Sequence, residues 1–115
     1  MTFLNIEQMT LKAYPFGKDQ GVYGNPVQRI FLLSEQGAKV QGVWDCSEGG
    51  FDITFTWEEF AYILEGEVQI TSDDRSSTIL RGGDLAHFKK GNTYRWDIPQ
   101  YLKKTFTAIV EEGDS

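Results

Sequence analysis

The sequence predicts an all-β fold in which about eight or more short antiparallel strands form one barrel around a pocket. After residue 28, runs of aromatic and β-branched residues alternate with clusters of Gly, Pro, Asn, Asp and Ser. These clusters recur about every 8–12 residues, the spacing typical of β-sandwiches and β-barrels. A chain of 115 residues has room for one such domain and one hydrophobic core.

Side-chain alternation identifies strands with one buried face. In residues 39–46, 52–57 and 93–98 the large apolar residues share one face of each strand. Residues 60–64 are apolar on both faces, which predicts a central strand covered on both sides. A glutamate and a glycine end this run too early for a helix. The patterns therefore favour a closed barrel or a sandwich over a single exposed sheet.

The first 28 residues are expected to form an N-terminal arm that packs on the barrel, and residues 29–115 the barrel itself. Glycines and prolines interrupt any long period in residues 1–28. The arm also contains Tyr14, Phe16 and Tyr23, more aromatic surface than a solvated tail would have. The sequence leaves open whether the arm covers its own barrel or that of a neighbouring subunit.

The charge and cysteine content narrow the partners and the compartment. Seventeen acidic residues against eleven basic residues give a formal net charge of −6. Such a chain repels phosphate polyanions, so we expect neither nucleic acid nor a membrane surface as a partner. Its longest apolar run is far shorter than the roughly 20 residues that span a bilayer. One cysteine, Cys46, and no signal-peptide pattern at the start predict a cytoplasmic location.

Two stretches of the chain have the spacing of a known motif pair. In EEFAYILEGEVQI, Glu59 stands seven residues before Gly66. In RGGDLAHFKKGNTYRW, a Gly-Asp pair precedes a short strand and then Gly91. This pair resembles the two motifs of the cupin superfamily, which implies a cupin-type double-stranded β-helix, a jelly-roll barrel. We expect both glycines at tight reversals between strands, where a positive φ favours glycine.

A narrower resemblance covers about residues 39–110. The stretch GVWDCSEGGFDITFTWEEFAYILEGEV and the closing RW look like the small single-domain cupins related to the cupin modules of (S)-ureidoglycine aminohydrolase. The superfamily hosts isomerases, dioxygenases, hydrolases, storage proteins and sensors on one scaffold. The resemblance therefore predicts a fold much better than it predicts a function.

The resemblance also bears on metal binding. Most catalytic cupins hold a divalent metal with an H-x-H pair, a glutamate and a third histidine. Glu59 matches the glutamate, but residues 52–55 contain no histidine, and Tyr94 stands where the third histidine is expected. His87 lies off the usual ligand positions. No cofactor is therefore predicted; manganese or zinc is disfavoured, and Glu59 is the residue that would hold such an ion.

The pocket implied by this match is aromatic, with one carboxylate. We predict Glu59 and Tyr94 as the catalytic candidates, because a carboxyl group among aromatic rings suits a general acid or base. Glu59 would otherwise belong to a hydrogen-bonded buried network with a tyrosine hydroxyl. The predicted ligand-binding residues are Trp44, Phe55, Trp57, Tyr62, Lys89 and Trp96.

Several of these side chains also have a plainer interpretation. The three tryptophans are what a hydrophobic core would use, and Lys89 fits a solvated loop tip. His87 and Cys46 fit packed strand residues. The sequence has no P-loop, nucleophile elbow or dinucleotide fingerprint, so nucleotide-driven chemistry is not expected.

Three functions remain open at this point. The first is a small-molecule-binding cupin without chemistry, whose ligand is a small polar or acidic metabolite. The alternative is a hydrolase or isomerase-like enzyme, resembling ureidoglycine aminohydrolase, that acts on a small nitrogenous or carboxylated metabolite with Glu59 as acid or base. The third is a scaffold that acts by assembly. A homodimer is expected in all three cases.

Overall fold

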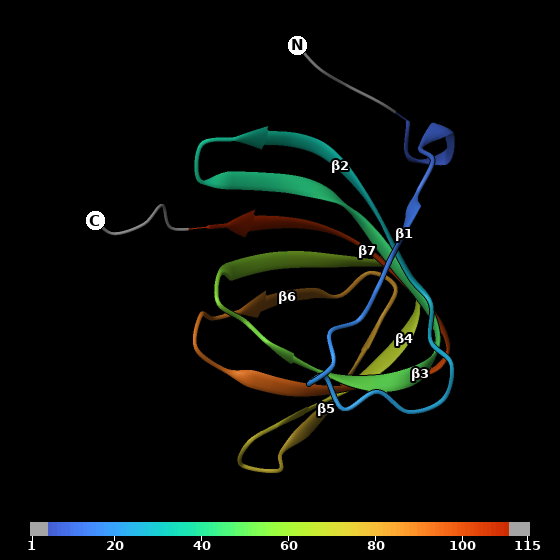
Figure 1. Cartoon of the computed structure of the whole chain (residues 1–115), viewed down its shortest axis with the longest axis vertical. Coiled ribbons are helices and arrows are strands. Elements are labelled where there is room, and N and C mark those ends of the chain that lie inside the picture. Colours follow the sequence, from blue (N-terminus) through green and yellow to red (C-terminus); the bar gives the residue numbers. More distant parts are fainter. Residues whose placement is uncertain (1–4, 111–115) are drawn as a thin grey trace.

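A computed structural model describes residues 5–110 as one curled antiparallel sheet (Figure 1). Residues 1–4 of the predicted arm and 111–115 of the predicted barrel lie outside the described residues. The all-β prediction is confirmed, since the one helical element described is a 3₁₀ turn at Ile6–Gln8. The strands are β1 (Lys12–Tyr14), β2 (Gln28–Gln36), β3 (Lys39–Thr54), β4 (Glu58–Ser72), β5 (Ser77–Arg81), β6 (Leu85–Phe88) and β7 (Thr93–Ile109).

The strand order places the three longest strands in the middle of the sheet. It runs β1-β2-β3-β7-β4-β5, and β6 pairs with the first part of β4. Strands β3, β4 and β7 each bend, so that each contributes to both the upper and the lower part of the molecule (Figure 1). The inner faces of these bent strands enclose the hydrophobic core.

The strands are fewer and longer than predicted, because β-bulges replace some of the expected turns. Within residues 5–110 there are seven, and β3, β4 and β7 contain 16, 15 and 17 residues. Two of the clusters of turn-forming residues, at 47–50 and 98–100, were expected to end strands but lie inside β3 and β7. In the first of them the pairing register shifts between Ser47 and Gly49. A bulge bends a strand without ending its ladder, so one strand turns a corner where the sequence suggests two.

The two motif glycines have different roles. Gly91 has a φ of +101° and lies in the turn between β6 and β7, as predicted. Gly66 has a φ of +81° but lies inside β4, where the register with β7 shifts, so its predicted reversal is wrong. A Cβ atom at Gly66 would collide with the backbone carbonyl of Tyr101. Glycine is therefore required there by a bulge and by a close backbone approach.

Alternation along β4 separates an inner face from an outer face. Glu59, Ala61 and Ile63 are buried, whereas Phe60 and Tyr62 are 44% and 40% exposed. The prediction that residues 60–64 are covered on both sides is therefore wrong, because the described residues do not enclose the outer face of this segment. Its period of two nevertheless points Glu59 inward, as the motif match implied.

Aromatic rings fill the core and join the N-terminal segment to it. The rings of Phe51 and Trp96 stack with centroids 6.1 Å apart, and Phe16 packs 4.7 Å from Phe51. Strand β1 pairs with β2, and Tyr23 forms a β-bridge with Gly50. This segment thus lies against the barrel of its own chain, while the predicted boundary at residue 28 and the exchange of the arm between subunits stay predictions.

Candidate functional site

A cavity of about 220 Å³ opens inside the curled sheet. It is lined by residues of β1, β2, β3, β4 and β7 and of the segments that connect them. Its walls are largely apolar, with few polar groups. The lining residues are Tyr14, Gln20, Gln28, Ile30, Val40, Trp44, Ile53, Phe55, Trp57, Glu59, Lys104, Phe106, Ala108 and Val110.

A buried ion pair crosses one wall of this cavity. Lys104 Nζ donates a hydrogen bond to Glu59 Oε2, and the two residues are 5% and 3% exposed. In the register of β4 and β7, Ile63 is the partner of Lys104 and Ala108 is the partner of Glu59. The long lysine side chain therefore reaches along the inner face of the sheet to the carboxylate.

Aromatic side chains hold both ends of the pair. The indole Nε1 of Trp57 donates to Glu59 Oε1 over 3.0 Å. Lys104 Nζ lies 5.0 Å from the ring centroids of Trp44 and Trp96 and 5.4 Å from that of Phe106, within the range of cation–π attraction. The Glu59 carboxylate thus accepts two hydrogen bonds, and the ammonium is surrounded by π faces.

The donor atoms here do not suit a divalent metal. Within residues 5–110, no three His, Cys, Asp or Glu side chains form a group that could hold one. The ammonium of Lys104 already lies against the Glu59 carboxylate. The segment matched to the H-x-H pair presents Ile53 and Phe55 to the cavity, and these offer only carbon atoms. The one carboxylate that matches a cupin metal ligand is thus paired with a lysine.

Four of the predicted site residues line the cavity together. They are Glu59, predicted as catalytic, and Trp44, Phe55 and Trp57, predicted as ligand-binding. The Glu59 network predicted as an alternative to catalysis does exist, but its partners are a lysine and an indole rather than a tyrosine hydroxyl. Trp44 lies on β3 and Glu59 on β4, and the short segment that joins these two strands carries Phe55 and Trp57.

Three other predicted residues lie away from the cavity lining. Tyr94 packs edge-on against Phe55 and Phe88, with ring centroids 5.9 and 5.4 Å away. Trp96 is fully buried beneath Lys104, and its indole nitrogen has no hydrogen-bond partner among the described residues. Lys89 is exposed where β6 leads into the turn before β7. Trp96 therefore lies where the interpretation as a core residue puts it, and Lys89 where the interpretation as a loop-tip residue does.

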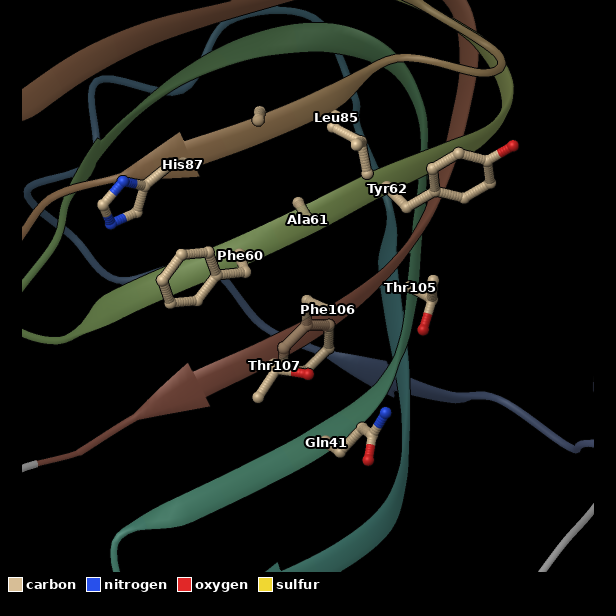
Figure 2. Close-up of a pocket in the computed structure, with 10 residues that line it drawn as sticks. Gln41, Phe60, Ala61, Tyr62, Leu85, His87, Thr105, Phe106 and Thr107 are labelled. Atoms are coloured by element: carbon tan, nitrogen blue, oxygen red, sulfur yellow. The ribbon is translucent and has the colours of Figure 1, made fainter.

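Tyr62 belongs to a different hollow, on the outer face of the sheet. This hollow of about 410 Å³ is formed by β3, β4, β6 and β7, and Figure 2 shows Tyr62, Phe60, Leu85 and His87 pointing away from the strands that bear them. The His87 ring stacks on Phe60 with centroids 4.4 Å apart. Its Nε2 lies 3.2 Å from a carboxylate oxygen of Glu58. The placement of Tyr62 in the inner pocket is thus corrected, because neighbouring residues of a strand face opposite ways.

Cys46 is a packed core residue. Its side chain is fully buried. Burial first, and then the charge of Asp45, raise the pKa of its thiol to about 12. A thiol held in the neutral form is a poor nucleophile. The interpretation of Cys46 as inert core packing describes its position.

Sequence reasoning missed Lys104, although the sequence contains a signal for it. In TFTAI, residues 105–109, threonines alternate with Phe106 and Ala108, which predicts that the latter two face inward. Extending that period by one step places Lys104 on the same inner face. A lysine at an inward position of an alternating strand is rare unless it is paired, so it indicates a buried partner.

Comparison with known proteins identifies the family of the chain. The family described as the EutQ-like cupin domain matches residues 33–106, more than half of the sequence. The chain belongs to this family. Its membership confirms the predicted cupin superfamily and the jelly-roll fold class, while the narrower resemblance to (S)-ureidoglycine aminohydrolase stays a prediction.

Three relatives show how far the likeness of this EutQ-like cupin extends. Acetate kinase EutQ of Clostridioides difficile (strain 630) is 25% identical over 97 residues, which are 80% of this chain and 61% of that protein. The structure of the Clostridium difficile EutQ protein matches with a TM-score of 0.69 at 20% identity, over 76% of this chain and 71% of the other. The structure of a DUF861 family protein from Thermotoga maritima matches with a TM-score of 0.54 at 33% identity, over 56% of this chain and 73% of the other. This chain thus spans about three fifths of the curated relative.

Other predictions concern the surroundings of the molecule. Residues 5–110 contain no helix that is both long and apolar enough to cross a membrane. The cytoplasmic location, the homodimer and the absence of a nucleic-acid partner stay predictions.

Proposed function

We propose that this EutQ-like cupin binds a small polar molecule in the inner cavity, with Glu59 and Lys104 as the polar anchor. One observation supports the proposal most directly: the buried ion pair borders open space of about 220 Å³. Removing two charges from water costs several kcal/mol for each ion, and the pair repays this cost only when further hydrogen bonds satisfy its remaining donors and lone pairs. A mostly apolar cavity with a few convergent polar groups is the common form of a small-molecule site.

The name of the curated relative adds acetate as a candidate for the acidic kind of ligand predicted from the sequence. Acetate would fit the cavity by size, and Lys104 would be its partner. Phosphoryl transfer would in addition need groups that hold the phosphates of a nucleotide. The cavity lining offers one cationic side chain, and this is already paired with Glu59. Our proposal for this chain is therefore binding rather than kinase chemistry.

Acid–base chemistry at Glu59 is the second candidate, because a carboxylate that borders a cavity can reach a bound molecule. It corresponds to the predicted hydrolase or isomerase-like activity on a small nitrogenous or carboxylated metabolite. The Glu59→Gln substitution tests this acid–base role separately from ligand binding. An enzyme of this kind would lose about 100-fold or more in turnover while still binding its substrate, whereas unchanged turnover would exclude it.

A ligand screen tests the binding proposal. Small polar metabolites are added to the wild type and to the double variant Glu59→Gln/Lys104→Met, and melting temperatures are recorded. The double variant should fold, because exchanging a whole buried ion pair for neutral groups is often tolerated. A ligand at about 100 times its Kd should stabilise the wild type by about 2.7 kcal/mol. It should stabilise the double variant much less. Equal stabilisation of both proteins would contradict the proposal.

A further inference from the structure

The inner cavity is electrically balanced. Two of its lining residues have a formal charge at neutral pH, Glu59 and Lys104, and they neutralise each other. An anion bound beside them would add an unpaired negative charge to a largely apolar space, and a cation would add an unpaired positive one. An uncompensated charge costs several kcal/mol in such surroundings, whereas a neutral polar group costs little once it is hydrogen-bonded.

Hydrogen bonding inside the protein already uses most other polar groups of the lining. The Gln28 side chain accepts from Trp44 Nε1 over 2.9 Å and donates to the Pro15 carbonyl over 3.4 Å. The Gln20 side chain donates to the Asp52 carbonyl over 3.2 Å and accepts from the Gly17 amide. Each amide thus has one N–H and its oxygen bound to partners of the chain itself, which fixes its orientation.

The ion pair also has hydrogen-bonding capacity left for a ligand. A lysine ammonium has three donors, and Lys104 makes one hydrogen bond within the described part of the chain, to Glu59. Each oxygen of the Glu59 carboxylate has two lone pairs, and the described donors to it are Lys104 and Trp57. The pair can therefore give one or two N–H donors to an oxygen and accept an N–H or O–H in return.

The size and walls of the cavity limit what can use this capacity. A volume of about 220 Å³ corresponds to roughly seven molecules of liquid water at ~30 Å³ each. Trp44, Phe55 and Trp57 supply apolar walls for a short hydrocarbon part of the ligand. A compact molecule with one bifunctional polar end fits these limits.

We infer that the cavity takes a small molecule with no net charge whose polar end combines an oxygen acceptor with an N–H donor, as a primary amide does. The carbonyl oxygen accepts from Lys104, and the amide N–H donates to Glu59. The inference rests on the proposed binding function. Of the polar or acidic metabolites predicted as ligands, it favours the uncharged polar ones.

Three probes of one shape but different charge test this inference: isobutyramide, isobutyrate and isobutylammonium. Each is titrated into the wild type by calorimetry at about pH 7.5, where the last two are ionised. The wild type should bind isobutyramide at least tenfold more tightly than either ion. Tighter binding of isobutyrate would overturn the inference but leave the proposed binding function standing. If none of the three bound, the inference would be wrong, and the metabolite screen would decide the binding function separately.

Two single substitutions then test the role of the charge itself. Glu59→Gln leaves the lining with one positive charge, so isobutyrate should become the tightest of the three probes. Lys104→Met leaves one negative charge, so isobutylammonium should become the tightest. Tyr62→Phe, on the outer face of the same strand, is the matched control and should keep the wild-type order. If a single variant fails to fold, the wild-type order still decides the question, and a preference unchanged in a folded single variant would contradict it.

Discussion

Two carboxylates are buried within residues 5–110, Glu59 and Asp45, which are 3% and 1% exposed and have very different surroundings. Asp45 accepts hydrogen bonds from Arg29 Nε over 2.9 Å and from the Tyr101 hydroxyl over 2.6 Å. The Arg29 side chain is about half exposed, so this network extends from the barrel wall to the solvent. Glu59 instead faces a buried lysine beside an open cavity.

This difference in surroundings suits Asp45 to a structural role and Glu59 to the proposed binding role. Burial, the largest single influence, raises the pKa of the Asp45 carboxyl. The hydrogen bonds from Arg29 and Tyr101 and the charges of Arg29 and Lys103 together outweigh it, so its pKa falls below the ordinary 3.8. A carboxylate so well satisfied has little reason to bind anything else. The Glu59–Lys104 pair has unused hydrogen-bonding capacity and a cavity in which to use it.

The largest expected effect comes from breaking the cavity pair on one side. Lys104→Met leaves the Glu59 carboxylate buried without its counter-ion, and should lower the free energy of unfolding by about 3–5 kcal/mol. Urea denaturation measures this. The double variant Glu59→Gln/Lys104→Met should recover most of the loss, because it removes both charges. A single variant as stable as the wild type would show that the pair is not buried.

Asp45→Asn should have a smaller effect and should spare the cavity. It removes the charge that Arg29 and Tyr101 bind, which costs about 2 kcal/mol for hydrogen bonds to a charged group. The loss is limited because Arg29 can turn to the solvent. The variant should still bind the ligands of the wild type with unchanged affinity. A loss of ligand affinity equal to that of a cavity variant would erase the distinction between the two carboxylates.

The pH dependence of stability should identify Asp45 as well. Since its pKa is lower in the folded state than in the unfolded chain, its contribution is complete above about pH 4. It is lost as the pH falls through the folded-state pKa. The difference in unfolding free energy between the wild type and Asp45→Asn should therefore shrink as denaturation is repeated from pH 6 towards pH 2. A difference that grew on acidification would contradict this assignment.

Tyr101→Phe should produce the smallest of these effects. It removes one of the hydrogen bonds to Asp45 but keeps the ring, and should cost about 1 kcal/mol. Burial, and then the hydrogen bond to Asp45, raise the pKa of the Tyr101 hydroxyl, so this group donates at all ordinary pH values. In the Asp45→Asn background the same substitution should cost clearly less. Full additivity of the two losses would show that the groups are not coupled.

Sequence patterns predicted part of the inner side of the site. The motif match placed Glu59 inward, and alternation put Trp44, Phe55 and Trp57 on the apolar faces of their predicted strands. Depth within the barrel was harder to predict: Tyr94 and Trp96 were expected to approach the cavity, yet neither lines it, and Trp96 lies in the core. A period identifies a face of a strand, but the distance from a cavity depends on the bend of the whole sheet.

Two features escaped prediction for definite physical reasons. Bulges use the same small residues as turns, so Gly66 resembled a reversal although it lies inside a strand. Lys104 was overlooked because lysine is usually exposed, and its burial depends on Glu59, which is far away in the sequence. An ion pair across distant strands has no local signature.

The most direct test follows the tryptophan indole groups during ligand binding. The chain has three tryptophans, and two of them, Trp44 and Trp57, line the cavity. In ¹⁵N-labelled wild-type protein, isobutyramide should shift the indole N–H signals of both in a saturable way, while equal concentrations of isobutyrate should leave them nearly unchanged. Unchanged indole signals with isobutyramide, or saturable shifts with isobutyrate alone, would contradict the account of a charge-balanced cavity that binds a neutral molecule.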